Sequence, residues 1–247
     1  MYNYQAQQQQ QLQRPRKRGR KLVIWVVVLL VLLVGLDFGA KAFAESEAAS
    51  QIQSHGFPTR PNVSIAGFPF LTQVITRHFD QVTISAANIP EGPITISKLN
   101  VVASDIRLSS GFSSGTTGPL HGTILISLGA LGDALGAAGP LAGFLGGGSG
   151  GLKVHSVGSN EVQGSLNLAG GILNASATWK VVAAGPHEID LQLVSSSGVP
   201  SQFAGKANNI MLPLSSLPAG LVLTGGLNSS ASGISANVSA QSLAFGG

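Results

Sequence analysis

The stretch Ile234–Gln241 has the sequence Ile-Ser-Ala-Asn-Val-Ser-Ala-Gln, in which apolar and polar residues alternate at every position. Successive side chains of a β-strand point to opposite faces, so this alternation predicts a strand with one dry and one wet face. With Gly, Pro, Asn and Ser between such segments, the chain predicts about eight to ten half-buried antiparallel strands. The same period of two recurs earlier in the chain, at Val82–Ser85, Ile94–Ser97, Val162–Leu168, Ala175–Val181 and Ile189–Leu193.

A run of fifteen uncharged, mostly aliphatic residues, Leu22–Leu36, lies near the N-terminus. Counted to Ala40 the segment has nineteen residues with Asp37 as its only charge, close to the roughly 20 that span a bilayer. The basic flank stays in the cytoplasm and the chain after the run is exported. Residues 22–40 therefore predict a single-pass signal anchor in the plasma membrane, with a disordered tail, residues 1–21, inside and residues 41–247 outside. The flanking cations are Arg14, Arg16, Lys17, Arg18, Arg20 and Lys21.

This segment could be cleaved by signal peptidase or stay uncleaved as an anchor. Ala42-Phe43-Ala44 resembles a signal-peptidase site, and cleavage there would release a secreted protein beginning at Glu45. Asp37–Ser54, however, is rich in alanine and has no Gly or Pro after Ala40, which predicts one continuous helix and favours the uncleaved anchor. Such a helix would hold the opening of the exported domain within about 25–30 Å of the bilayer.

Charge and cysteine content limit the function of the exported part. Seven of the fourteen Lys and Arg residues lie at or before Lys41, so Glu45–Gly247 carries seven basic and nine acidic side chains. The domain is therefore slightly acidic and is not expected to bind nucleic acid. The chain has no cysteine, which excludes disulfides, thiolate chemistry and Cys-ligated metal.

The segment Leu128–Gly151 differs from the rest because it is rich in glycine and small apolar residues. Leu128, Leu131 and Leu135 have helical spacing, but each glycine weakens a helix by about 1 kcal/mol. Two interpretations stay open: a lid or membrane-touching loop, and a low-complexity insertion between strands.

No constellation for catalysis is evident. Gly-x-Ser-x-Gly occurs around Ser113 and around Ser149, but both copies lie in Gly/Ser-rich segments without the strand and helix that a hydrolase elbow needs. The five histidines are scattered and no metal-ligand spacing is present. We expect no enzyme activity, no metal and no cofactor; a serine hydrolase is the third hypothesis.

Two motifs carry a family resemblance. The first is Gly67-Phe68-Pro69-Phe70-Leu71-Thr72-Gln73, and the second comprises Leu212-Pro213-Leu214 and Leu217-Pro218-Ala219-Gly220-Leu221. With the basic and apolar N-terminal segment and the β-rich sequence between them, these motifs resemble the LmeA-type phospholipid-binding family of actinobacteria, over about Gly35 to Phe245.

The resemblance implies a mainly β fold (α+β): a curved antiparallel sheet or half-barrel around an apolar cavity, similar to tubular lipid-binding folds, after the N-terminal transmembrane helix. It also implies phospholipid as the partner, and a role in envelope lipid transport and the assembly of mannan-containing glycolipids in mycobacteria. The Gly-rich segment is longer than the resemblance leads us to expect.

The leading hypothesis is a membrane-anchored phospholipid-binding protein of the cell envelope. The alternative is a structural or scaffolding envelope protein whose core is filled by its own side chains; an open apolar groove of several hundred Å³ would favour the lipid binder. The candidate acyl-chain residues are Phe68, Phe70, Leu71, Val82, Ile84, Ile94, Ile96, Leu128, Leu131 and Leu135. The candidate head-group residues, chosen by charge, are Arg60, Arg77, Lys98 and Arg107.

Overall fold

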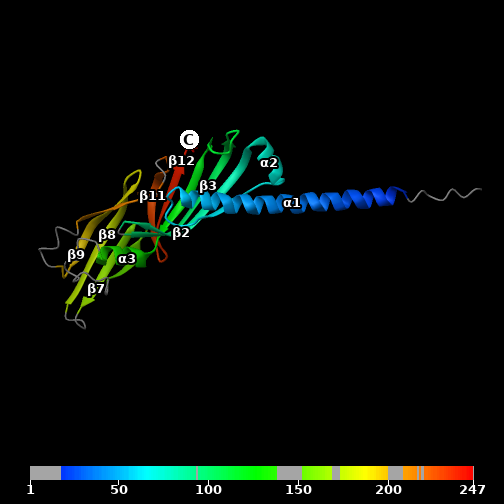
Figure 1. Ribbon diagram of the computed structural model, residues 1–247. Helices are drawn as coiled ribbons and strands as arrows, with labels where there is room; N and C mark the ends of the chain where they lie inside the picture. Colours follow the sequence, from blue (N-terminus) through cyan, green and yellow to red (C-terminus); the bar gives the residue numbers. More distant parts are fainter. Residues whose placement is uncertain are drawn as a thin grey trace, which may run out of the picture.

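The computed structural model describes residues 18–92, 94–137, 152–168, 173–199, 208–215, 217 and 220–246. Over these residues the chain is an elongated molecule built on two antiparallel sheets and one long helix (Figure 1). The N-terminal half of that helix extends beyond the sheets, and the second sheet lies at the opposite end of the molecule (Figure 1).

The first sheet has eight strands, with the order β1-β2-β3-β5-β12-β11 and with β4 bridging β3 and β13. Every pairing in it is antiparallel. Its strands are β1 (Asn62–Ile65), β2 (His78–Glu91), β3 (Ile94–Leu108), β4 (Gly115–Thr116), β5 (Leu120–Ile126), β11 (Val222–Ser230), β12 (Gly233–Ala240) and β13 (Ala244–Phe245).

The second sheet has five strands in the order β10-β9-β8-β7-β6, again antiparallel throughout. The inward residues of the two sheets belong to one continuous hydrophobic core, in which Trp179, Ile189 and Leu191 of the second sheet are fully buried. Its strands are β6 (Lys153–Gly158), β7 (Glu161–Leu168), β8 (Leu173–Gly185), β9 (Glu188–Ser197) and β10 (Asn209–Pro213).

The long helix α1 (Arg18–Ser54) has two different halves. The large apolar side chains between Ile24 and Leu36 are exposed, whereas Ala49 is buried against the sheets. The C-terminal half of α1, which packs on the first sheet, is held by a polar contact as well: the Ile65 N–H of β1 donates to Glu45 Oε1 at 2.7 Å. The continuous helix predicted for Asp37–Ser54 is therefore confirmed.

Two shorter helices complete the fold: α2 (Phe70–Thr76), directly before β2, and α3 (Leu128–Ala137), directly after β5. Leu131 and Leu135 are fully buried, so α3 is a core helix, which neither interpretation of the Gly-rich segment anticipated. Three leucines in helical spacing bury enough apolar surface to offset the glycines between them. Residues 138–151 of that segment lie outside the described residues.

The hairpin of β2 and β3 changes its buried face along its length. The buried positions of β3 are even-numbered at Ile94 and Ile96 and odd-numbered at Leu99, Val101 and Ala103. Asn88, which faces this step across the hairpin, has a left-handed backbone with φ 53. A left-handed residue turns the side chains that follow it to the other face of the sheet. Strands β2 and β3, of 14 and 15 residues, therefore each appear in the sequence as two shorter alternating segments.

The predicted fold class is confirmed. The chain is mainly antiparallel β, with an apolar N-terminal helix, and its sheets are open rather than closed into a barrel. The described part has thirteen strands rather than eight to ten, because β4 and β13 have only two residues each and the edge strands β1 and β10 have only four and five, too few for a period to stand out.

Candidate lipid-binding site

The segment that follows β10 joins the two sheets. The Leu214 N–H donates to the carbonyl of His187, in the turn between β8 and β9, at 2.9 Å. The next residue, Ser215, donates its N–H to Glu91 Oε2 at 2.7 Å. Glu91 is buried at the tip of the β2–β3 hairpin, so this segment connects the far end of the first sheet to the second.

The turn between β8 and β9 is fastened to β11 in the same region. His187 Nε2 lies 2.7 Å from the carbonyl oxygen of Leu221, which can only accept, so Nε2 carries the proton in this contact. The Leu223 N–H donates to the carbonyl of Pro186 at 2.8 Å. The His187 ring N–H and the Leu223 backbone N–H thus hold the turn in place, each through a backbone carbonyl.

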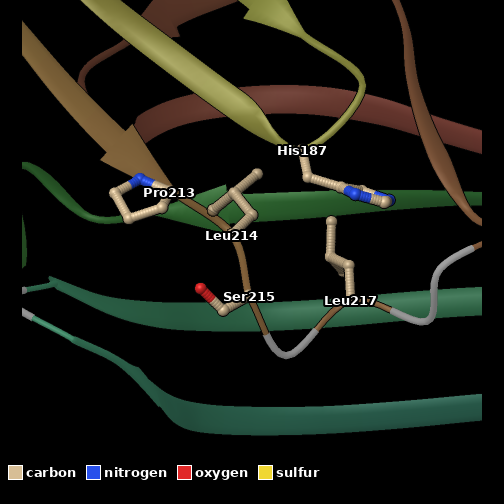
Figure 2. A pocket seen from close by; sticks show the side chains of 5 residues that line it. All are labelled: His187, Pro213, Leu214, Ser215 and Leu217. Carbon is tan, nitrogen blue, oxygen red and sulfur yellow. The ribbon is translucent and has the colours of Figure 1, made fainter.

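An open pocket of about 500 Å³ lies at this junction. The close-up shows the His187 ring on one side and the chain from Pro213 to Leu217 on the other (Figure 2). Its size lies within the roughly 300–1,000 Å³ of typical small-molecule sites. The described residues that line it are His187, Pro213, Leu214, Ser215 and Leu217.

The pocket has an apolar wall and a polar edge. Leu214 and Leu217 are buried and continue into the hydrophobic core, whereas Pro213 and Ser215 are exposed. None of the described lining residues is an acid, a lysine or an arginine. Such a surface suits a hydrocarbon chain, for which burial contributes about 0.8 kcal/mol per CH₂ and no polar recognition is needed.

The ten candidate acyl-chain residues do not line this pocket. Five are buried in the core: Phe70, Ile94, Ile96, Leu131 and Leu135. Three are half-buried: Val82, Ile84 and Leu128. Phe68 and Leu71 are exposed, the first just before α2 and the second in its first turn. The alternating pattern identified dry faces, but side chains of the protein already occupy most of them.

The four candidate head-group residues are likewise separated from the pocket. Arg60 donates to the carbonyl and hydroxyl of Ser46 on α1, at 3.2 and 3.0 Å. Lys98 is exposed in the middle of β3, and Arg77 is exposed at the end of α2. Arg107 lies at the end of β3 that is nearest to α2, paired across the hairpin with His78.

Asp105 contacts both Arg107 and His78. Its carboxylate accepts from Arg107 Nε at 3.2 Å and lies 2.7 Å from His78 Nε2. The hydrogen bond from Arg107, helped by the one from His78, holds the pKa of Asp105 below its usual value. This cluster is exposed and lies at the α2 end of the hairpin, whereas Glu91 and the pocket lie at the other end.

The pocket residues were missed as a site in the sequence. The Leu-Pro motif that contains Leu214 and Leu217 carries the family resemblance, but its sequence does not indicate that it lines a pocket. The local sequence Ile-Pro-Glu-Gly does not indicate that Glu91 is buried. It also does not indicate that Glu91 accepts a hydrogen bond from Ser215, 124 residues later.

The serine hydrolase hypothesis gains no support in the described residues. Ser113 is exposed in the connection between β3 and β4, and Ser149 lies outside the described residues. The described part of the chain contains no cluster of three or more His, Asp or Glu side chains able to hold a metal ion.

Comparisons with known proteins agree with the family resemblance. No curated protein and no solved structure matches the chain. The family model described as LmeA-like phospholipid-binding matches residues 35–239, from the middle of α1 to the end of β12. Because this match covers most of the chain, the protein belongs to the LmeA-like phospholipid-binding family.

Proposed function

We propose that this chain is a phospholipid-binding protein of the cell envelope, anchored in the plasma membrane by α1 with its N-terminus in the cytoplasm and its sheets outside. The family match supports phospholipid binding. For the acyl chain we propose the pocket between His187 and Leu217, whose buried leucines continue into the core. Binding rather than catalysis is the proposed activity.

The anchor is supported by exposure and length. Among the described residues, one helix, Ile24–Ser54, is long and apolar enough to cross a membrane. Its large apolar side chains up to Leu36 are exposed, with no cover from the part of the chain that the structure describes. A surface of this kind is stable in lipid and costly in water.

We expect α1 to stay uncleaved after Ala44. The residues around this position are helical, whereas a protease needs an extended substrate, and the matched family region begins at residue 35, before the site. The intact mass of the protein extracted from membranes should therefore include residues 1–44. A mature protein that begins at Glu45 would contradict the anchor.

If α1 is the anchor, we propose that the pocket lies further from the bilayer than the sequence led us to expect for the opening. From His78, beside α2, to Glu91, at the pocket, β2 runs 14 residues, or roughly 40 Å at about 3.3 Å per residue. This exceeds the 25–30 Å expected for the opening. We therefore propose that the protein presents lipid to, or receives it from, a site away from its own membrane.

A photoactivatable phospholipid, with a diazirine at the end of one acyl chain, tests the pocket. With the full chain in lipid nanodiscs, irradiation should label the peptide that contains Leu214 and Leu217. Ser215→Trp should reduce this labelling several-fold, since the exposed Ser215 side chain lies at the pocket and its N–H bond to Glu91 does not depend on the side chain. Mass spectrometry of the cross-linked peptides gives the measurement.

Ser195→Trp is the matched control, since Ser195 is an exposed serine on β9 that does not line the pocket. Labelling of α1 by surrounding lipid gives an internal standard in every sample. If Ser215→Trp leaves the labelling unchanged, or if the pocket peptide is never labelled, the scaffold with a self-filled core becomes the better interpretation.

A further inference from the structure

The short helix α2 and the loop before it present an apolar stripe to the outside. Phe68, Leu71 and Ile75 follow the i, i+3, i+7 spacing of one helical face, and their exposed fractions are 63%, 37% and 82%. The opposite side of α2 is buried through Phe70 and Gln73. A helix on a water-facing surface normally carries polar groups on its outer side, so this stripe requires an apolar partner.

The stripe is fixed to the membrane-facing part of α1. The Phe70 and Leu71 N–H groups donate to the two oxygens of Asp37 at 2.8 and 2.7 Å. The rings of Phe38 and Phe68 stack with centroids 6.1 Å apart. Phe38, itself 60% exposed, joins the stripe to form one surface, which we call the α2 patch: Phe38, Phe68, Leu71 and Ile75.

The position of the patch along α1 points to its partner. Phe38 comes two residues after the exposed apolar run that ends at Leu36. At 1.5 Å per residue, the nineteen residues from Leu22 to Ala40 span about 28 Å, close to the ~30 Å of the hydrocarbon core. If α1 crosses the membrane, the α2 patch lies at the level where the helix leaves the hydrocarbon, since Phe38 belongs to the patch and α2 lies beside α1 (Figure 1).

Charge at the edge of the patch fits a lipid surface. Arg77 follows α2 directly in a left-handed conformation, φ 55, and is exposed. Its carbonyl accepts from the Leu108 N–H at 2.9 Å, which places the end of β3, with Arg107, beside it. Asp105 pairs with Arg107, whereas Arg77 has no ion pair among the described residues. A cation beside an apolar helix face is typical of segments that lie in the head-group layer.

We infer that the α2 patch inserts into the outer leaflet of the membrane that α1 crosses, so that the domain is held at two points and cannot rotate about its anchor. This inference rests on the proposed anchoring by α1. The partner to which it commits is the lipid of that leaflet; a second protein surface is the competing occupant.

The chain has no cysteine, so a single introduced one can carry a fluorescent label. The full chain is reconstituted in vesicles of phosphatidylcholine and phosphatidylglycerol with the label at Ile75→Cys, at Val31→Cys in the anchor, or at Val194→Cys on β9. All three positions are exposed in the protein alone, so labelling should not disturb the fold. A phospholipid with a nitroxide high on its acyl chain quenches labels in lipid, and aqueous iodide quenches labels in water.

The Ile75 label should be quenched by the nitroxide lipid and be several-fold less accessible to iodide than the Val194 label. If Ile75 behaves like Val194 while Val31 is quenched by lipid, the inference is wrong and the anchor stands. An Ile75 label shielded from iodide but not quenched by lipid would show a protein partner and also overturn it. If Val31 too is in water, the proposed anchor itself fails.

Discussion

Replacement of Asp37 by alanine should destabilise the protein by about 3 kcal/mol, because a hydrogen bond to a charged group contributes roughly 1.5–3 kcal/mol and two are lost. Asp37 is buried, and both of its carboxylate oxygens accept from the first N–H groups of α2. These N–H groups have no partner within their own helix, so removal of the carboxylate leaves them to water that only partly reaches them. Urea unfolding of the full chain in detergent measures the loss.

Asp37→Asn provides an intermediate case, since an amide oxygen can keep one of the two bonds, and its loss should fall between wild type and Asp37→Ala. Glu47→Ala is the matched control: Glu47 is an exposed acid on the same helix, bonded to Gln51 of α1 alone. Hydrogen exchange should show the change concentrated in residues 66–77 for the Asp37 variants. Equal stability of Asp37→Ala and Glu47→Ala would contradict this role.

The same contact explains how the predicted span accommodates its one charge. A carboxylate at the end of an apolar segment is costly unless it is paired or hydrogen-bonded. Here the Phe70 and Leu71 N–H groups of α2 both donate to the Asp37 carboxylate. Asp37 therefore fixes α1 to α2, and the orientation of the α2 patch depends on it.

Replacement of Trp179 by alanine should have a comparable or larger effect, about 3–5 kcal/mol, because a fully buried aromatic side chain is lost and a cavity remains. Trp179 lies in β8 between Val162 of β7 and Leu193 of β9, and it has no exposed surface. Gly164 leaves room for its ring, since a Cβ there would lie 2.9 Å from the Trp179 Cζ3 atom. Denaturant unfolding followed by far-UV circular dichroism gives the measurement.

Trp25→Ala serves as the control, since Trp25 is exposed on α1, outside the sheets, and its loss creates no cavity. Substitutions away from buried features usually change stability by no more than about 0.5 kcal/mol. The chain has two tryptophans, so in the Trp25→Ala protein the fluorescence reports Trp179 alone. An unfolding midpoint for Trp179→Ala that equals that of the control would show that the second sheet does not depend on this side chain.

Local pattern was enough for much of the fold. The alternation at Ile234–Gln241 predicted β12, and the alanines of Asp37–Ser54 predicted the docked half of α1. Both succeed because a strand or a helix has a fixed period, and the period of the apolar residues is visible in a short window. The pattern failed at Asn88, where a left-handed residue interrupts the period, and at α3, where glycines hid a buried helix.

The site was less predictable than the fold. The buried leucines of the pocket lie in a motif that the sequence showed, but Glu91, which holds that motif, comes from a hairpin 124 residues earlier. Phe68 and Leu71, predicted to contact an acyl chain, are exposed, and an apolar residue in a sequence does not show whether it faces a core or the outside.

The sequence by itself determined the β class of the domain, the apolar N-terminal helix and the family, since each depends on residues close together in the chain. Only the tertiary structure decided that Asp37 caps a helix 33 residues away, that the leucine motif closes a pocket, and that Phe38 and Phe68 share one outer surface. The physical reason is that periodicity fixes which side of an element is apolar. Which apolar sides meet is fixed by the chain reversals and hydrogen bonds that bring distant segments together.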